Sequence, residues 1–337
     1  MAGYVEGADY SGRDIYYGVA METTRGTAVN PWYGLRWETA DFEDKATTQL
    51  NKSALGVLNQ DSGAEVTELW GEGQLAGKVT DRAIGVILYG LMGGYGKSLH
   101  SGETIVYDHT YTASQANSLQ SLTITRKDPN VVEQWPESIV GSFELEVKAG
   151  DFVRHTTNFT SQPSSVANIT PHVFVDEEEF VSRHVTAVFA NQYSGLAGGA
   201  ALPLTSLKLT VNNNVTPYWI IGQNNPYNVF AQSTTIVGEM ELLYDSYEFK
   251  QIRFNNTPQA VLITVQNTNV TIGVAAHPTI TFTMPLAYLT EWKPDQSLDG
   301  MVQQTISFNA VYSLDFGFAL DIVQTSLVSS YLVGPTS

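Results

Sequence analysis

The chain has 337 residues, of which 43% are hydrophobic and only 15% are charged, so it can bury packed cores and is not a disordered protein. Its formal net charge of −17 makes it a poor candidate for tight nucleic-acid binding, because affinity for phosphate comes mainly from Lys and Arg side chains. Cysteine is absent, which excludes disulfides, thiolate metal sites and a cysteine nucleophile.

The length suits two domains of roughly 150 to 170 residues, and no segment indicates secretion or membrane insertion. Residues 1–6 contain no basic segment followed by an apolar run, so no signal peptide is expected. No stretch approaches the ~18 uncharged apolar residues of a membrane span. We therefore expect a chain that folds in the cytoplasm and contacts no membrane.

The first half of the chain is expected to begin with a strand at 15–21, a long loop of small residues at 22–34 and a returning strand. The glycine-rich stretch 71–77 has a strand pattern, in which glycine favours a bulge or a close backbone approach. A helix is predicted over 81–91, with Asp81 as the candidate N-cap.

Most other segments alternate between apolar and polar residues with the period of two that is typical of strands. Examples are 121–125 and 142–147 in the first half and 279–283 in the second, all rich in β-branched or aromatic residues. The second half also begins with a strand, at 181–190, and a long loop of small residues, at 191–203.

The two halves resemble one another in the order of their segments. A second helix is predicted over 245–254 and opens with Asp245, as the first opens with Asp81. Four pairs of segments match in order: 35–39 with 207–211, 73–76 with 238–241, 122–125 with 280–283, and 152–159 with 301–308. Duplication of one β-rich unit would explain this order, and two unrelated β-domains of similar composition are the alternative.

The predicted fold class is therefore mostly β, with two tandem β-sandwich or half-barrel domains at 1–171 and 172–337, each flanked by one α-helix. Loops as long as those at 22–34 and 191–203 are usually functional or disordered. Their matching placement predicts arms that order against a neighbouring subunit, although ordinary mobile hairpin tips are the alternative. The candidate arm residues are Arg25, Gly26, Gly195, Leu196, Gly198 and Gly199.

No catalytic or cofactor site is expected. The stretch 90–98 resembles a phosphate-binding loop, but Leu91 stands where the pattern needs glycine, and the stretch follows a predicted helix instead of opening one. It is therefore expected to be a helix stop followed by a loop. The six histidines are scattered without the spacing of metal ligands. The acidic run at 176–179 is either a solvated segment or a weak divalent-cation site, and the first interpretation is favoured. We expect no enzyme activity, no cofactor and no metal.

Several segments resemble the tail tube proteins of long-tailed, non-contractile phages. They are 18–28, 53–57, 73–79, 122–130, 145–147, 211–215 and 290–292. Each motif is structural and weak alone, but the ordered set is spread over most of the chain and is fairly specific. The resemblance implies tail-tube-like β-sandwich domains with one flanking helix, subunits that close into rings, and rings that stack into a tube.

This resemblance implies a structural virion protein of the phage tail, assembled in the host bacterial cytoplasm, whose tube conducts DNA into the host. The implied partners are other copies of the chain, a tape-measure protein in the lumen, tail terminator and tail-tip proteins, and viral DNA in transit without tight binding. Rings in this family have six-fold character, so a duplicated chain predicts a trimeric, pseudo-hexameric ring.

A negatively charged lumen would keep DNA from adhering, because attractive phosphate contacts would slow its passage. Acidic residues on the polar faces of candidate strands could supply this charge, although they could equally face outward or lie at subunit contacts. The candidate lumen residues are Glu68, Glu72, Glu144, Glu146, Glu239 and Glu241.

Two other functions remain open from the sequence. A virion surface or tail-tip protein that binds host carbohydrate would show an exposed aromatic platform, for which Trp32, Trp135, Trp219 and Trp292 are candidates. A secreted β-fold hydrolase is the more remote alternative, because neither a signal peptide nor a catalytic motif supports it.

Overall fold

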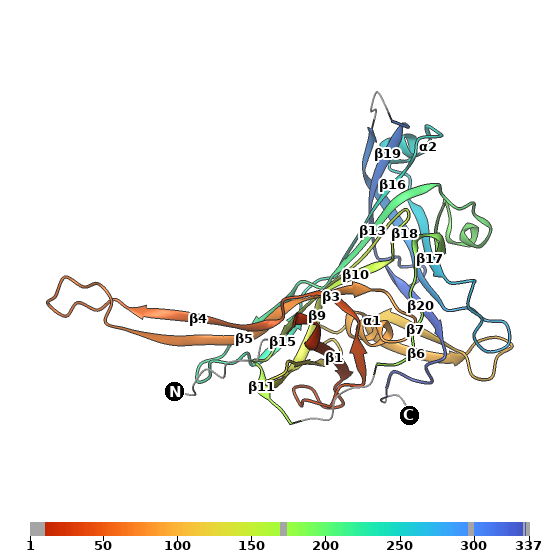
Figure 1. Cartoon of the computed structure of the whole chain (residues 1–337). Helices are drawn as coiled ribbons and strands as arrows, with labels where there is room; N and C mark the ends of the chain where they lie inside the picture. Colours follow the sequence, from red (N-terminus) through yellow and green to blue (C-terminus); the bar gives the residue numbers. More distant parts are fainter. Residues whose placement is uncertain (1–10, 169–173, 296–299, 333, 335–337) are drawn as a thin grey trace.

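The computed structural model describes residues 11–168, 174–295, 300–332 and 334, and it is mostly β, as predicted (Figure 1). The predicted domain boundary between residues 171 and 172 lies outside the described residues. The described residues on either side of it are called the first half, 11–168, and the second half, 174–334.

The first half holds most of the strands and one α-helix, α1 (Ile84–Met92). Its strands are β1 (Tyr16–Met21), β2 (Tyr33–Leu35), β3 (Trp37–Ala40), β4 (Glu43–Asn51), β5 (Gly63–Lys78), β6 (Gly93–Leu99), β7 (Tyr107–Ala113), β8 (Leu122–Lys127), β9 (Val132–Lys148), β10 (Arg154–Ser161) and β11 (Ser165–Val166). The strands predicted at 121–125 and 142–147 are confirmed as β8 and part of β9.

The second half is built in the same way around a short helix, α2 (Glu248–Phe254). Its strands are β12 (Val185–Ala190), β13 (Leu204–Asn212), β14 (Val215–Tyr218), β15 (Asn228–Ala231), β16 (Thr235–Leu243), β17 (Gln259–Gln266), β18 (Thr279–Asp295), β19 (Gln303–Ala310) and β20 (Asp321–Ser326). Short 3-10 helices lie at Gly12–Asp14, Ser182–His184 and Tyr193–Gly198.

The strands of the two halves pair in the same order. In the first half the order is β1–β8–β9–β10–β5, and β5 then pairs with both β3 and β4. In the second half the order is β12–β17–β18–β19–β16–β13. The 17-residue strands β9 and β18 pair with β8 and β17 respectively along their first parts and with β10 and β19 along their last parts, so each connects two sheets.

The β-bulges of the two halves also fall at matching places. Between β9 and β10, the register shifts at Gly141, and between β18 and β19 it shifts at Thr290. Between β3 and β5 it shifts just before Thr39, and between β13 and β16 it shifts just before Ser206. Because a bulge fixes where side chains change face, each shared bulge aligns the two halves residue by residue.

Strand pairing joins the described parts of the two halves at two junctions. At the first, β9 pairs with β13, so that β4, β5, β10, β9, β13, β16, β19 and β18 form one continuous sheet, here called the long sheet. At the second, β7 pairs with β20, which in turn pairs with β18. One large apolar cluster draws residues from both halves, so the core is shared.

Each helix packs against its half through apolar side chains. α1 is enclosed, with all its residues except Tyr89 buried, and it ends at Gly93, whose φ of 79° is the left-handed conformation common at helix ends. α2 buries Phe249 and Ile252 and lies beside β18. The predicted flanking helices are therefore present, but both are shorter than predicted.

The predicted caps of both helices are wrong. Asp81 does not cap α1, because the helix begins at Ile84 and Ala83 takes the N-cap position without a side-chain hydrogen bond. Asp81 is instead buried and accepts a hydrogen bond of 2.8 Å from the Glu178 N–H. α2 begins three residues after Asp245, and Tyr247 takes its N-cap position.

Two further expectations differ from the structure. Beyond its helix stop, the stretch 90–98 continues as β6 rather than as a loop. The segment 122–125 lies in β8, whose counterpart by strand order is β17, so its match with 280–283 in β18 is wrong. The pairs 73–76 with 238–241 and 152–159 with 301–308 lie on counterpart strands in register. The pair 35–39 with 207–211 falls largely on the counterpart strands β3 and β13 but out of register, because the shared bulge aligns Thr39 with Ser206. The close backbone approach expected in 71–77 is confirmed, because a Cβ on Gly73 would lie 2.3 Å from the Phe42 Cα atom.

Candidate assembly surfaces

The long sheet has one polar face, and the strand registers place all six predicted lumen residues on it. Residues directly opposite one another in an antiparallel pair share a face. Glu146 lies opposite Lys208, and Lys208 lies opposite Glu239 on its other side. Glu144 and Glu241 belong to the same alternating rows, and Glu72 and Glu68 continue the face on β5.

The polar face is not uniformly acidic. Lys208 Nζ lies 2.9 Å from Glu144 Oε1, and Lys148 Nζ lies 2.7 Å from Glu146 Oε1. Arg154 stands directly opposite Glu146 on β10. The face therefore carries rows of acidic side chains interrupted by paired cations. Whether these glutamates line a lumen stays a prediction, because one chain displays the face but not what it encloses.

The opposite face of the long sheet covers the core. Phe143 and Leu145 of β9, Leu209 of β13 and Ile306 of β19 are all buried, and they alternate with the polar residues described above. This clean alternation is typical of an antiparallel sheet with one solvated face.

The two ends of the long sheet are strand edges that no described strand covers. At one end β4 pairs with β5 alone. At the other end residues 288–295 of β18 pair with β19 alone. Figure 1 shows these edges on opposite sides of the molecule, with β4 extending away from the body and the β19 end lying beside α2. Open edges of this kind are ready to pair with a further chain.

The hairpin of β4 and β5 is the most prominent projection of the molecule (Figure 1). It is called the β4–β5 arm here, and the sequence interpretation did not foresee it. Near its tip, large apolar side chains are exposed to solvent, namely Leu50, Leu55, Val57, Leu58 and Val66. A row of exposed apolar side chains on an extended hairpin indicates a contact with another protein surface.

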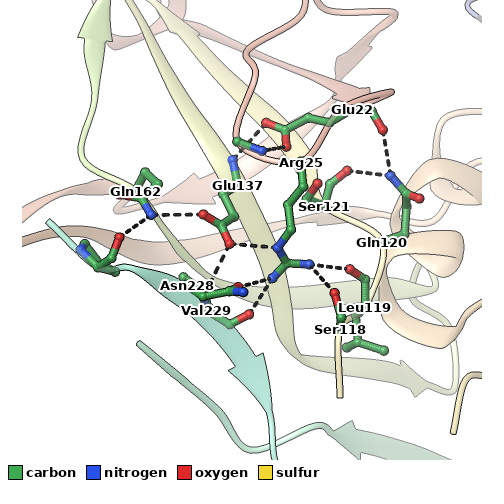
Figure 2. Close-up of polar contacts among 12 residues, drawn as sticks. Glu22, Arg25, Ser118, Leu119, Gln120, Ser121, Glu137, Gln162, Asn228 and Val229 are labelled. Carbon is green, nitrogen blue, oxygen red and sulfur yellow. Dashed lines mark hydrogen bonds and ion pairs between the residues drawn. The ribbon is translucent and has the colours of Figure 1, made fainter. Parts of the chain in front are cut away.

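The loop at 22–34, predicted to be an arm, is held within the chain by Arg25. Figure 2 shows the guanidinium at the centre of this network, with all five of its N–H groups engaged. Its Nε donates to Glu137 Oε1 at 2.8 Å, and Nη1 donates to Ser118 and to the Leu119 carbonyl oxygen. Nη2 donates to Asn228 and to the Val229 carbonyl oxygen, which belong to the second half.

A second carboxylate fixes the base of the same loop. Glu22 is buried and accepts hydrogen bonds of 2.8 Å from the Gly26 N–H and 2.8 Å from the Glu137 N–H (Figure 2). Burial raises the pKa of Glu22, and these hydrogen bonds oppose the rise. The Arg25 guanidinium and the Gly26 N–H therefore donate their hydrogen bonds within the chain. Their contact with a neighbouring subunit stays a prediction.

The other predicted arm, at 191–203, forms the 3-10 helix Tyr193–Gly198. Leu196 is buried with Val188 and Ala260, so its side chain packs inside the chain. Gly195 and Gly199 approach this packing closely, while a Cβ on Gly198 would meet open space. Contact of this segment with a neighbouring subunit stays a prediction.

The acidic run at 176–179 is not simply solvated, which corrects the favoured interpretation. Glu177 is buried and accepts a hydrogen bond from the Ala83 N–H, so its carboxylate lies at the start of α1. Burial raises the pKa of Glu177 to about 7. Glu179 forms an ion pair with Lys78 at 2.9 Å. The run is a structural connection between the halves.

Buried histidines likewise have packing roles. Burial lowers the pKa values of His109 and His155 to about 4, so both are neutral near pH 7. Among the described residues, no group of three or more His, Cys, Asp or Glu side chains could hold a metal ion. No helix in the described ranges is long and apolar enough to cross a membrane.

Comparison with known proteins identifies the family of the chain. The family model of phage tail tube proteins matches residues 12–310, which is most of the chain. The chain therefore belongs to the phage tail tube protein family, and it is a structural component of a virion tail. No curated protein matches the sequence.

Proposed function

We propose that this chain polymerises into rings that stack to form the tail tube of a long-tailed, non-contractile phage. The observation that carries the proposal is the long sheet, whose two equivalent halves leave an open edge at each end. Such a sheet satisfies its edge groups when copies join edge to edge and close into a barrel. Identical head-to-tail contacts close a ring by rotation.

The shared strand order and bulges support two tandem domains, which we place at 1–171 and 172–337. Unrelated β-domains would have no reason to shift register at counterpart residues such as Gly141 and Thr290. If each domain supplies one of six positions, three chains close one pseudo-hexameric ring.

We place the polar face of the long sheet toward the lumen. Its glutamates would repel DNA phosphates, and the paired lysines would moderate that repulsion. In this arrangement the lumen holds the tape-measure protein during assembly in the host cytoplasm and passes DNA during ejection. Tail terminator and tail-tip proteins then bind the two ends of the tube. The chain acts by shape and charge, without an enzyme site.

The β4–β5 arm is the best candidate for contact between successive rings. Its exposed apolar tip needs a cover, and its length takes it beyond the body of its own subunit (Figure 1). We assign the stacking contact to this arm rather than to the loop at 22–34, because Arg25 already satisfies all its donors within the chain.

Negative-stain electron microscopy of the purified protein tests the proposal. Stacked rings or tubes are the expected result, and three-fold averages of end-on views are expected to show six similar lobes. Discrete monomeric particles at every concentration would contradict it. A variant lacking the arm tip, residues 52–62, is the matched control, because it should fold and form single rings without stacking.

The carbohydrate-binding alternative lacks the platform it requires. Trp135 is only 1% exposed, and Trp32 and Trp292 are partly buried against the core. Trp219 packs edge-on against Trp70, with ring centroids 5.8 Å apart. All four candidate tryptophans are buried or half-buried, and none is a fully exposed side chain.

A further inference from the structure

We propose that the β4 edge of one copy pairs with the β18 edge of the next copy in one register, which sets Glu43 opposite Lys293 and Lys45 opposite Glu291. This inference rests on the proposed function, and it adds the residues and the register that close the ring. Its basis is the junction of β9 with β13, which joins the two halves inside one chain.

That internal junction serves as the template. Along it, Ser142 lies opposite Asn212 and Glu144 lies opposite Thr210, with the strands antiparallel. β9 is the last strand that the first half gives to the long sheet, and β13 is the first strand from the second half. The free β18 edge corresponds to β9, and the free β4 edge corresponds to β13.

The bulges at Gly141 and Thr290 show which residue of β18 corresponds to each residue of β9. Ser142 directly follows the bulge in β9, and Glu291 directly follows the bulge in β18. Two residues further along are Glu144 and Lys293, which lie opposite a threonine on β10 and on β19 respectively. Ser142 thus corresponds to Glu291, and Glu144 corresponds to Lys293.

A second bulge converts β13 positions into β4 positions. Thr39 in the first half corresponds to Ser206 in the second, because each directly follows its bulge. Four residues further along, Glu43 corresponds to Thr210, and six residues further along, Lys45 corresponds to Asn212. No further register shift falls between Thr39 and Lys45, because β4 continues β3 along the same strand, β5, in one register.

Carrying the template register over to the free edges gives two pairs of opposite charge. Lys45 comes to lie opposite Glu291, and Glu43 comes to lie opposite Lys293. Backbone pairing and bulges alone give this register, so the complementary charges are independent support for it. Lys45 already contacts Glu43 within its own strand, and the two β18 residues would extend this contact into a row of alternating charges.

One position in this register has two like charges, because Asp41 falls opposite Asp295. Asp41 is turned toward its own chain, where its Oδ1 accepts a hydrogen bond of 2.6 Å from the Gln74 N–H. That hydrogen bond reduces the charge that Asp41 presents to a neighbour. The two charge-complementary pairs therefore outnumber and outweigh the repulsive one.

The partner must be a second copy, because the two edges of one chain cannot meet. They bound the long sheet at opposite ends, with six strands between β4 and β18 (Figure 1). Each edge strand pairs with a neighbouring strand on one side only, and pairing with a second copy would supply hydrogen-bond partners for the other side of both strands.

Disulfide cross-linking tests the register directly, since the chain contains no cysteine of its own. Directly opposed residues in an antiparallel pair have Cα atoms about 4.5 to 5.5 Å apart, within the range that a disulfide spans. The variant Lys45→Cys with Glu291→Cys should form covalent oligomers on oxidation of assembled rings. On a non-reducing gel, the ladder should stop at three chains.

The matched control moves one cysteine along the same edge. Lys45→Cys with Asp295→Cys keeps both edges cysteine-bearing but out of register, and it should give little covalent product. Rings that assemble normally yet cross-link only in this shifted pair, or in neither pair, would overturn the register. Failure of the unmodified protein to form any ring would instead overturn the proposed function.

Charge exchange provides a second measurement. Exchanging Glu291→Lys together with Lys293→Glu leaves the net charge unchanged but sets like charges opposite Lys45 and Glu43. Ring assembly at low salt, followed by sedimentation, should fall at least several-fold. Adding Glu43→Lys with Lys45→Glu should restore it. Equal assembly by the exchanged variant and the unmodified protein would contradict the proposal.

Discussion

The two halves differ most in how they connect their counterpart strands β4 and β5, and β13 and β16. In the first half these strands lengthen into the projecting β4–β5 arm. In the second half they stop, and the connection forms the separate hairpin of β14 and β15, which folds back on the first half. Val229 of this hairpin packs with Leu119 and Ile139.

This difference shows which parts the shared frame leaves free to vary. The strand order and bulges that position the long sheet are the same in both halves. The connection between the equivalent strands differs, because it projects from the first half and folds back in the second. The folded-back hairpin also supports the arm, because the Leu69 N–H donates to the Asn224 carbonyl oxygen at 2.8 Å. One connection therefore braces the subunit, and its counterpart reaches outward.

The largest expected effect comes from releasing the folded-back hairpin. Arg25→Ala removes the cation that holds Glu137, whose side chain is 7% exposed, and also both hydrogen bonds to the hairpin. Glu137 would keep its hydrogen bonds from Gln162 Nε2 and the Val229 N–H but lose its cation, which should lower the free energy of unfolding by about 3 kcal/mol. Urea unfolding measures this loss, and hydrogen exchange should show faster opening of residues 215–231.

A paired substitution separates charge from packing at this site. Arg25→Met with Glu137→Gln removes both charges and should recover part of the lost stability. Arg13→Ala on the exposed 3-10 helix is a matched control with little expected effect. If Arg25→Ala unfolds like the unmodified protein, the hairpin is held by its apolar contacts alone.

The next effect compares counterpart glycines. Gly73 and Gly238 lie opposite Phe159 and Phe308 in the two halves. A Cβ on Gly73 would meet the Phe42 backbone, whereas a Cβ on Gly238 would meet the Phe308 ring. Because backbone yields less than a side chain, Gly73→Ala should cost about 3 kcal/mol and Gly238→Ala about 1 to 2 kcal/mol in thermal unfolding. A larger loss for Gly238→Ala than for Gly73→Ala would contradict this difference in packing.

The sequence predicted the strands with alternating patterns better than it predicted the arm or the long-range register. Alternating patterns correctly predicted β8, part of β9 and the start of β18. In these parts of β9 and β18 the apolar positions face the core and the polar ones are half-buried, whereas in β8 the threonines that alternate with Leu122 and Ile124 are buried as well. The projecting part of the β4–β5 arm escaped prediction because β4 buries no residue and residues 63–70 of β5 bury none either, so neither has a buried face to impose a pattern. The candidate lumen residues could be chosen from strand faces, but their common face depends on long-range register, which no local pattern encodes.

A smaller effect, dependent on pH, distinguishes the starts of the two helices. Glu177 lies at the start of α1 with its pKa raised by burial to about 7, from an ordinary value of 4.5, and α2 has no such residue among its described contacts. Between pH 4.5 and 7 the folded state keeps a proton that the unfolded state has lost. The contribution of Glu177 to stability therefore falls as pH rises through this window, by at most about 3 kcal/mol.

Glu177→Gln isolates this contribution, since its amide oxygen can still accept the Ala83 N–H. The variant should match the unmodified protein near pH 4.5 and become about 1 to 2 kcal/mol more stable by pH 8. The lowered pKa values of His109 and His155 make stability rise with pH between about 4 and 6.5, but they affect both proteins equally. A difference that does not change with pH would exclude Glu177 as the source.

The smallest effect is expected at the start of α2. The sequence predicts Asp245 as the cap of this helix, but Asp245 is exposed and the helix begins three residues later at Glu248. Asp245→Ala should therefore change the free energy of unfolding by less than about 0.5 kcal/mol. Glu248→Ala is the matched control, because a carboxylate in the first turn interacts with the helix dipole and its loss should cost about 0.5 kcal/mol. A cost above about 1 kcal/mol at Asp245 would mean that α2 extends in solution to the start predicted from the sequence, with a side-chain cap that α1 lacks.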